Sequence, residues 1–348
     1  MAAVRSRPAA RPAPEHTGAP VIRTETILDL ATIGGNQTHA EALEGSIALA
    51  QTAEKAGYER IWYAEHHNMP TIASSAPAVL IAAIAARTER IKLGSGGVML
   101  PNHAPLTVAE QFGTLANLHP GRIELGLGRA PGTDQRTMRA LRRDPRSADS
   151  FPQDVQELQG YLGDETLVPG INAIPGKGTH VPLYILGSSL FGAQLAAALG
   201  LPYAFASHFA PDAMLQAMQV YRENFRPSEV LSEPHAFATM NVIAADDEDD
   251  AARQLVYVQR GLVRSMLSRG GKRFTDEEAD MLLETPQGMK IKNMFGHVAV
   301  GKPDRVREQI AEFGRFSTAD ELIVVHQATR LDDRLRSVEL TAEALGLG

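Results

Sequence analysis

The sequence predicts an α/β protein folded as one (β/α)8 TIM barrel. Short β-rich runs alternate with longer helical patterns from about residue 24 to the C-terminus, without a linker-like break, and eight such units fit the 348 residues. The first strand-to-helix turn, LATIGGNQT, lacks the GxGxxG pattern that a dinucleotide-binding sheet carries there. A doubly wound open sheet is therefore the less favoured alternative.

Four strands and three helices are predicted in the first half of the barrel. Thr38 and Glu41 have the spacing of a capping box at the start of the first helix, which Gly57 ends. Thr107 and Glu110 predict a second capping box, at the start of the third helix. The predicted strands cover 25–30, 58–64, 91–95 and 123–127, and the second helix covers 75–86.

The second half repeats the pattern and contains an insertion. Gly200 ends one helix, the acidic run 246–250 complements the dipole at the start of another, and Pro303 opens a third. The predicted strands cover 181–186, 203–206, 236–244 and 321–325, and further helices cover 151–162, 190–199 and the region of Met214 to Phe225. The segment 267–296, between the seventh and eighth predicted strands, is expected to be an insertion.

Composition excludes several kinds of protein. Hydrophobic residues make up 44% of the chain and charged residues 22%, as in folded globular proteins. A net charge of −7 does not favour nucleic acid as a partner, and the longest apolar run, 76–86, is too short to span a membrane. The absence of Cys excludes disulfides, thiolate metal sites and cysteine nucleophiles. We therefore expect a cytoplasmic protein.

The beginning of the chain differs in composition from the rest. Its first twenty residues are rich in Ala, Pro and Arg and contain no apolar core of a secretory signal. We expect residues 1–23 to form a disordered tail and residues 24–348 to form a single barrel domain.

Polar side chains follow most of the predicted strands at their carboxyl ends, where barrels of this kind carry their active sites. These residues, in chain order, are Glu65, His66, His67, Asn68, Asn102, His103, Arg129, Ser188, Ser189, Ser207, His208 and His326. Their convergence predicts a polar site at one end of the barrel.

Arg129, Ser188 and Ser189 predict an anion site. A guanidinium binds phosphate oxygens in pairs, and the serines stand where a helix begins with free backbone N–H groups. The alternative is that Arg129 pairs with Asp134 and that the serines cap their helix. The residues alone leave these two interpretations level.

The pair His66–His67 invites a metal interpretation with Glu65 as a third ligand. We do not favour it, because adjacent residues in an extended segment point apart and no HExxH helix is present. An acid/base or hydrogen-bonding role for one imidazole fits better, since neutral His is available near pH 7. The alternative is a loop histidine bonded to local backbone.

The glycines of GSGGVMLP do not form a P-loop, because no Lys and no helix follow them. Gly96 and Gly97 indicate either the close approach of a flat ligand or a simple bulge. The chain also lacks a GxSxG elbow and a paired-carboxylate signature, so nothing favours a hydrolase.

Several motifs together resemble the bacterial luciferase-like flavin monooxygenases. They are AEHHN at 64–68, LGSGGVMLPNHAPLTVAEQFGTL at 93–115, PGRIELGLGRAPGTD at 120–134, VPLYILGSSLFGAQLAAALGLPYAFASHFAP at 181–211 and VGKPDRV at 300–306. The resemblance covers the chain from about residue 24 onward.

This resemblance implies a TIM barrel that binds FMN at the carboxyl ends of its strands, usually as a homodimer. Arg129, Ser188, Ser189 and Gly192 would hold the flavin phosphate. Gly96 and Gly97 match the place where the family often has a non-proline cis peptide beneath the flavin ring. His66 matches the active-site histidine. The remaining polar residues at the mouth would line the substrate pocket: His67, Asn68, Asn102, His208 and His326.

The implied reaction uses reduced FMN from a separate flavin reductase. It reacts with O2 to give a C4a-hydroperoxyflavin that oxygenates a small organic substrate, while the protein positions the reactants and excludes water. The segment 267–296 would act as a mobile lid. Bioluminescence is not expected, because Gly128 replaces the reactive cysteine of light-emitting members and Ser188 replaces an acidic residue.

Three other functions stay open on the sequence alone. One is an F420-dependent or other oxygen-independent oxidoreductase of the same superfamily. Another is a non-catalytic FMN-binding protein, and the third is a barrel hydrolase or lyase without a flavin. Nothing in the sequence selects among an aliphatic aldehyde, an aromatic polyketide-like molecule and a terpenoid ketone as the substrate.

Overall fold

Eight parallel strands close into a barrel, and a ninth pairs outside the ring. The computed structural model describes residues 22–35, 37–268 and 274–348. The strands from β1 to β6 pair in chain order, β6 pairs with β7, and β9 closes the ring between β7 and β1. The bounds are β1 (Arg23–Asp29), β2 (Arg60–Tyr63), β3 (Lys92–Met99), β4 (Ile123–Gly128), β5 (Leu183–Gly187), β6 (Tyr203–Phe205), β7 (Ala236–Ala244), β8 (Val298–Gly301) and β9 (Glu321–His326). The predicted TIM-barrel fold is confirmed.

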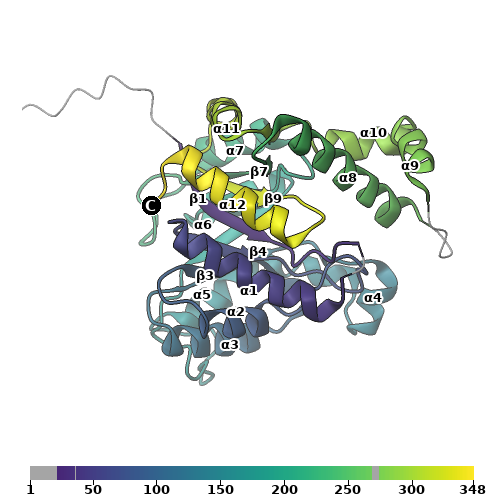
Figure 1. The fold of residues 1–348 in the computed structure, drawn as a ribbon. Helices are drawn as coiled ribbons and strands as arrows, with labels where there is room; N and C mark the ends of the chain where they lie inside the picture. Colours follow the sequence, from purple (N-terminus) through teal and green to yellow (C-terminus); the bar gives the residue numbers. More distant parts are fainter. Residues whose placement is uncertain (1–21, 36, 269–273) are drawn as a thin grey trace, which may run out of the picture.

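Helices cover the outside of the barrel, and α1 packs beside α12, the last helix of the chain (Figure 1). Their bounds are α1 (His39–Lys55), α2 (Pro77–Ala85), α3 (Pro105–Leu118), α4 (Gln135–Ala140), α5 (Phe151–Leu162), α6 (Leu190–Leu199), α7 (Met214–Asn224), α8 (Glu248–Leu267), α9 (Asp276–Leu283), α10 (Pro286–Asn293), α11 (Pro303–Ser317) and α12 (Leu331–Leu345). Across the described ranges, none of these helices has both the length and the apolar character needed to cross a membrane.

The structure corrects the sequence analysis at several places. The capping box at Thr107 and Glu110 is wrong: α3 begins at Pro105 after Ala104 and has no side-chain cap, because proline at the first helical position already sets the start. The short elements β8 and α4 were not predicted. Arg23, placed in the tail, is the first residue of β1, and the rest of the predicted tail, except residue 22, lies outside the described residues.

Large aromatic side chains fill the middle of the barrel. The ring of Trp62 lies 4.8 Å from that of Tyr184 and 5.8 Å from that of Phe237, in a cluster with Leu28 and Ile323. Gly94 on the neighbouring strand leaves room for Trp62, because a Cβ at this position would come within 2.6 Å of the indole ring. This packed layer separates the two ends of the barrel.

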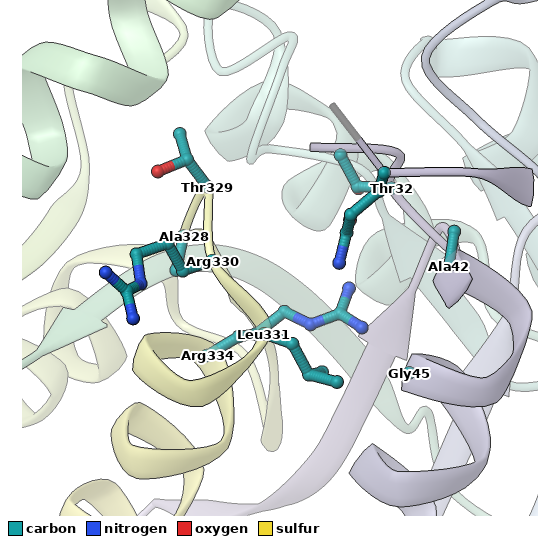
Figure 2. Close-up of a pocket in the computed structure, with 9 residues that line it drawn as sticks. Thr32, Ala42, Gly45, Ala328, Thr329, Arg330, Leu331 and Arg334 are labelled. Carbon is teal, nitrogen blue, oxygen red and sulfur yellow. The ribbon is translucent and has the colours of Figure 1, made fainter. Parts of the chain in front are cut away.

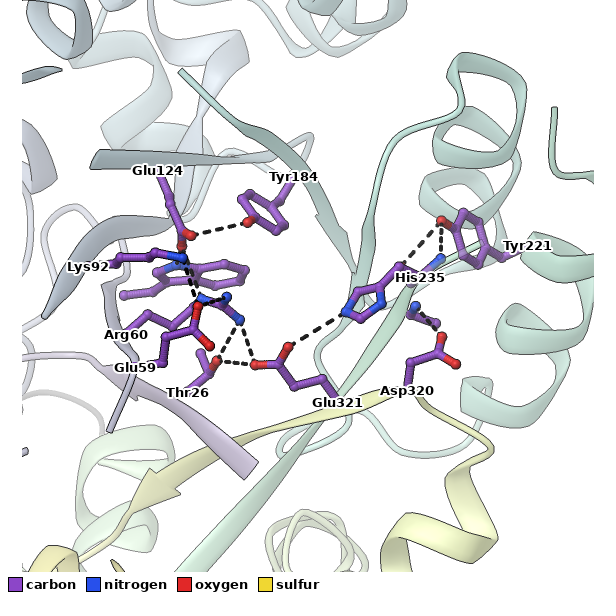
Figure 3. Close-up of polar contacts among 12 residues, drawn as sticks. Thr26, Glu59, Arg60, Lys92, Glu124, Tyr184, Tyr221, His235, Asp320 and Glu321 are labelled. Carbon is purple, nitrogen blue, oxygen red and sulfur yellow. Dashed lines mark hydrogen bonds and ion pairs between the residues drawn. The ribbon is translucent and has the colours of Figure 1, made fainter. Parts of the chain in front are cut away.

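A network of charged groups closes the amino end of the barrel (Figure 3). Buried Arg60 donates to Glu321 Oε1 at 2.6 Å, and its Nε lies 3.4 Å from Glu124 Oε2. Both carboxylates accept further hydrogen bonds: Glu321 from Thr26 at 2.6 Å, and Glu124 from the indole N–H of Trp62 at 2.7 Å. Burial alone would lower the pKa of Arg60, but these carboxylates raise it above its usual value. Arg60 therefore stays charged.

The insertion after β7 consists of α8, α9 and α10, which pack on one another around a small apolar cluster of their own. The Arg260 guanidinium pairs with Asp276 at 2.8 Å and with Asp280 at 2.6 Å, and so joins α8 to α9. Residues 269–273 of the predicted lid lie outside the described residues. The mobility of the segment 267–296 stays a prediction.

Candidate functional site

Two histidines face the mouth, the carboxyl end of the barrel, from opposite sides. His66 follows β2 and His208 follows β6, and four strand positions separate β2 from β6 around the ring. The backbone N–H of His66 donates to Ser74 O at 2.9 Å, which fixes the loop after β2. Asn241 on β7 fixes the other loop, because its Nδ2 donates to His208 O at 2.8 Å.

Both imidazoles have a nitrogen without a partner. Nδ1 of His66 and Nδ1 of His208 are buried, and neither forms a hydrogen bond with the described residues. Burial lowers the pKa of His66, and burial, with a smaller contribution from the nearby His66, lowers the pKa of His208 to about 3. Both rings are therefore neutral near pH 7. A buried, unpaired ring nitrogen is costly, so these two atoms indicate a place for a ligand.

Glu65 joins the loops that follow β2 and β3. Its Oε1 accepts hydrogen bonds from Nε2 of His67 and Nε2 of His103, both at 2.8 Å, and its Oε2 accepts from the Met99 N–H at 3.0 Å. Burial opposes ionisation of this carboxyl, but the two imidazoles and the amide lower the pKa of Glu65 to about 2. The group is thus a fully buried carboxylate held by donors on three sides.

The ligand atoms of Glu65, His67 and His103 lie within 4.8 Å of one another, a spacing that could also hold a metal ion. Glu65 and His67, two residues apart, share one face of an extended segment, and His103 joins them from the loop after β3. In the described contacts both imidazoles and a backbone amide donate to the carboxylate. That arrangement is typical of a hydrogen-bonded anion.

Asn102 and Asn68 lie around the same loops. Asn102 is buried, and its Nδ2 donates to Pro131 O at 2.9 Å while its Oδ1 has no partner among the described residues. Asn68 is exposed and donates to the hydroxyl of Thr137 at 3.1 Å. The structure therefore brings His66, His67, Asn68, Asn102 and His208 to the mouth, as the sequence predicted, and leaves their role toward a substrate as a prediction.

The Gly96–Gly97 peptide bond is cis. Neither position has room for a side chain, since a Cβ at Gly96 would lie 2.6 Å from Leu28 Cδ1 and one at Gly97 would lie 2.6 Å from Gly126 O. The pairing of β3 with β4 is irregular between Ser95 and Val98, on either side of this bond. Close packing against Leu28 and against the Gly126 backbone therefore requires glycine at both positions.

Arg129 reaches the start of α6. Its guanidinium carbon lies 4.0 Å from the centre of the Phe191 ring, in the first turn of that helix. Arg129 forms no ion pair with a described residue, and Asp134 instead caps α4 by accepting from Thr137 N–H at 2.8 Å. The alternative in which Arg129 pairs with Asp134 is therefore wrong.

Ser189 occupies the N-cap of α6, yet its side chain makes no capping hydrogen bond. The alternative in which this serine caps the helix is wrong as well. The backbone N–H groups of the first turn therefore have no side-chain acceptor from Ser189. Gly192 is buried in that turn, and a Cβ there would lie 3.2 Å from Tyr203 and 3.7 Å from Gly187 Cα. Small residues thus let the helix start close to the end of β5.

This donor set fits the phosphate of a flavin nucleotide. An exposed guanidinium without an acidic partner lies beside a helix start whose hydroxyl and amide donors have no side-chain partner. Across the mouth, the unpaired nitrogens of His66 and His208 fit a flat polar ring system. Arg129, Ser188, Ser189 and Gly192 are the residues that would hold the phosphate.

His326 does not reach the mouth. Although it ends β9, its side chain is buried outside the ring, where Nδ1 contacts Ser337 Oγ at 2.9 Å and Nε2 lies 3.5 Å from the hydroxyl of Tyr58. Burial and the charge of Arg334 lower the pKa of His326 to about 3. Its predicted place in the substrate pocket rested on strand-end position alone, which does not fix the face on which a side chain lies.

A small cavity lies between the loops that follow β1 and β9, close to His326 in the chain. Its walls come from the loops before α1 and α12, and its volume of about 10 Å³ suits one water molecule. Figure 2 shows the Arg334 side chain extending from α12 toward Thr32 and Gly45. Arg334 Nη1 donates to Asp29 Oδ1 at 3.2 Å. The buried pair ties β1 to α12 and has a structural role.

Sequence analysis missed the amide pair behind His208. Asn241 is buried in β7, accepts from Gln327 Nε2 at 3.0 Å, and donates to Met294 O at 3.1 Å at the end of α10. It connects the barrel, the loop after β6 and the insertion. The available signal was a single amide inside the mostly apolar run FATMNVIA.

Known proteins share this fold and sequence over most of the chain. A "Luciferase-like monooxygenase" of Escherichia coli (strain K12) is 46% identical over 320 residues, which cover 91% of this chain and 96% of that protein. The "N-acetyl-S-alkylcysteine monooxygenase" of Bacillus subtilis is 31% identical over 92% of this chain and 97% of its own length. The crystal structure of apo-MsnO8 superposes with a TM-score of 0.82 at 35% identity, over 94% of this chain and 99% of that one.

More distant structures share the fold alone. A 3,6-diketocamphane monooxygenase component in complex with FMN and an F420-dependent secondary alcohol dehydrogenase each give a TM-score of 0.67 at 17% identity, over 93% of this chain and 97% and 98% of theirs. The family model of the luciferase-like monooxygenases matches residues 26–318, from β1 through α11. With the barrel and its polar mouth in place, that match and the near full-length relatives show that this chain belongs to the luciferase-like monooxygenase family.

Proposed function

We propose that this protein is an FMN-dependent monooxygenase that uses reduced FMN and O2 to oxygenate a small organic substrate. The observation that carries the proposal is Arg129, which lies over Phe191 at the start of α6 without an acidic partner. A guanidinium and a free helix start form a donor set for a terminal phosphate. FMN ends in such a phosphate, whereas riboflavin lacks one.

The chain's own residues would bind and enclose the cofactor. Arg129, Ser188, Ser189 and Gly192 hold the phosphate, and Gly96 and Gly97 leave bare backbone beneath the ring system. When bound, reduced FMN supplies the electrons that activate O2. The remaining work of the protein is to orient the substrate and exclude water.

His66 is the residue we propose to act on the reacting atoms. Burial keeps its imidazole neutral near pH 7, and its unpaired Nδ1 is available for a hydrogen bond or a proton. Glu65 bonds to His67 and His103 and not to His66, so nothing described competes for that nitrogen. His66 would therefore donate to, or shuttle a proton near, the oxygen being transferred.

Two partners belong to the same proposal and rest on the family resemblance. A separate flavin reductase would supply the reduced FMN. The enzyme would act as a homodimer. Reductase-coupled turnover and the mass of the protein in solution test these two statements independently.

The central test mixes the protein with chemically reduced FMN and aerated buffer and follows flavin absorbance by stopped flow. We expect an oxygenated flavin species that lasts longer than in free solution. If reduced FMN oxidises at the same rate with and without protein, the proposal fails. An anaerobic assay with reduced F420 in place of FMN separates the oxygen-independent alternative, since turnover there would contradict ours.

His66→Ala tests the role of the imidazole. We expect FMN affinity to be kept and turnover to fall roughly 10²-fold or more, the usual contribution of a general acid or base. His119→Ala, at the amino side of β4, is the matched control and should leave turnover unchanged. Full turnover of His66→Ala would remove His66 from the mechanism.

A further inference from the structure

A short segment after β4 concentrates positive charge. Residues 129–146 contain six arginines and two aspartates, in a chain whose net charge is −7. The arginines are Arg129, Arg136, Arg139, Arg142, Arg143 and Arg146, and we call the first five the arginine rim. This segment therefore has a net positive charge, although the chain as a whole is acidic.

The segment lies over the mouth. The His67 N–H donates to Gly132 O at 3.2 Å, and the hydroxyl of Thr133 donates to His67 O at 3.0 Å. Farther along, Asn68 donates to Thr137 on α4, and Arg143 Nε donates to Asn102 O at 3.1 Å. These contacts fix the rim against the loops after β2 and β3, and in Figure 1 α4 lies beyond the end of the barrel strands.

The charges of the rim are available to solvent. Arg129, Arg136, Arg139 and Arg142 are exposed, and no member of the rim forms an ion pair with a described residue. Of the two aspartates, Asp134 caps α4 and interacts with the charge of Arg136, and Asp144 pairs with Arg146 at 3.1 Å. Most other exposed arginines of the described chain form an ion pair with a carboxylate. Arg336, for example, pairs with Asp246 at 2.7 Å.

Clustered like charges repel one another, so they do not stabilise the fold. Their physical effect is a positive potential, which extends about 8 Å at physiological ionic strength and speeds the encounter with anions. Arg129, which directly follows β4, is the member of the cluster already placed at the start of α6. The cluster therefore includes the guanidinium of the donor set described above.

We propose that the arginine rim is a capture surface for the anionic phosphate end of a flavin nucleotide, which it guides to Arg129 and the start of α6. This proposal rests on the proposed function and adds how the cofactor arrives. In this proposal Arg136, Arg139 and Arg142 increase the rate at which the flavin nucleotide associates. Arg129 and the serines retain the bound phosphate.

The test measures association kinetics by stopped-flow fluorescence, with FMN and riboflavin as paired probes. The rim variant is Arg136→Glu/Arg139→Glu/Arg142→Glu. The matched control, Lys55→Glu/Arg90→Glu/Arg315→Glu, changes the same net charge at exposed positions around the amino end. Each protein is measured at low salt and again at high salt.

We expect the rim variant to bind FMN roughly tenfold more slowly than the wild type at low salt, within the range known for electrostatic steering. The dissociation rate should change little, riboflavin should associate equally fast with all three proteins, and high salt should remove the difference. The control variant should behave like the wild type, because its charges lie far from the mouth.

Three outcomes would overturn the proposal. Equal FMN association rates at low salt would show that the rim does not steer. Slower riboflavin binding by the rim variant would show a distorted mouth instead. A defect seen only when a reductase delivers the flavin would make the rim a protein-docking surface. If the wild type binds neither flavin, the proposed function itself fails, which separates the two conclusions.

Discussion

The two ends of the barrel treat polar groups in opposite ways. At the amino end, Arg60 lies between two carboxylates, and each of those carboxylates accepts a further donor. At the mouth, His66 and His208 each keep a buried ring nitrogen without a described partner, and Arg129 has no acidic partner. The fold thus gives the buried cation at one end ion-pair partners, although Arg60 Nε itself makes no hydrogen bond, and leaves ring nitrogens and a guanidinium unpaired at the other.

The paired groups at the amino end stabilise the fold, whereas the unpaired groups at the mouth point to a function. A buried charge that has partners is costly to disturb, whereas a buried polar group without a partner already costs stability and is kept for another reason. Proteins break such local rules mainly at functional sites. The comparison therefore predicts that substitutions at the two ends change the free energy of unfolding in opposite directions.

The largest effect is expected at the amino end. Arg60→Met should lower the free energy of unfolding by about 3 to 5 kcal/mol, because it leaves Glu124 and Glu321 buried without their cation. Arg87→Met is the control, since the exposed pair with Glu44 contributes less than about 1 kcal/mol. Urea unfolding measures both. A loss at Arg60 no larger than at Arg87 would end the contrast between the two ends.

His326 gives a pH-dependent effect of intermediate size. Its pKa is about 3 in the folded protein and near its ordinary 6.5 in the unfolded chain, so the unfolded state binds more protons between these values. Stability is therefore complete above pH 6.5 and falls toward pH 3, by up to about 1.4 kcal/mol per pH unit for this group.

His326→Gln should flatten that slope by this amount, whereas His39→Gln, at an exposed position, should not change it. Urea unfolding at a series of pH values between 6.5 and 4 measures the slope. An unchanged slope in His326→Gln would show that this imidazole becomes protonated in the folded state.

The smallest effect is a gain in stability at the mouth. His208→Leu removes a buried nitrogen without a partner, and we expect the free energy of unfolding to rise by about 1 kcal/mol while turnover falls. His119→Leu serves as the control. Thermal and urea unfolding measure the change, and a clear loss of stability would mean that Nδ1 of His208 has a partner in solution, such as a bound water.

Much of the fold could be predicted because local signals agreed with the architecture. The helix over Leu190–Leu199 with Gly200 at its end, and the strand over Ala236–Ala244, match the structure at both ends. The short strand β8 was missed, because four residues at the edge of an insertion carry too little pattern. The start of α3 was misplaced because a proline competed with an apparent capping box.

The site was predictable only in part. Strand-end position found His66, His208, Arg129 and the serines, since parallel strands bring their carboxyl ends together. It failed for His326, because position along a strand does not give the face of the barrel. It also gave no sign of the carboxylate shared by His67 and His103, which depends on a contact between two loops.

We propose that the mouth binds a flavin by its phosphate, through Arg129 and the start of α6. Equilibrium titration of FMN and riboflavin into the wild type and Arg129→Ala tests it most directly. We expect the variant to lose roughly 10- to 100-fold in FMN affinity, the effect of removing a charged hydrogen-bond donor, and to bind riboflavin as the wild type does. An equal loss of affinity for both flavins, or no loss of affinity for FMN, would show that Arg129 does not bind the phosphate.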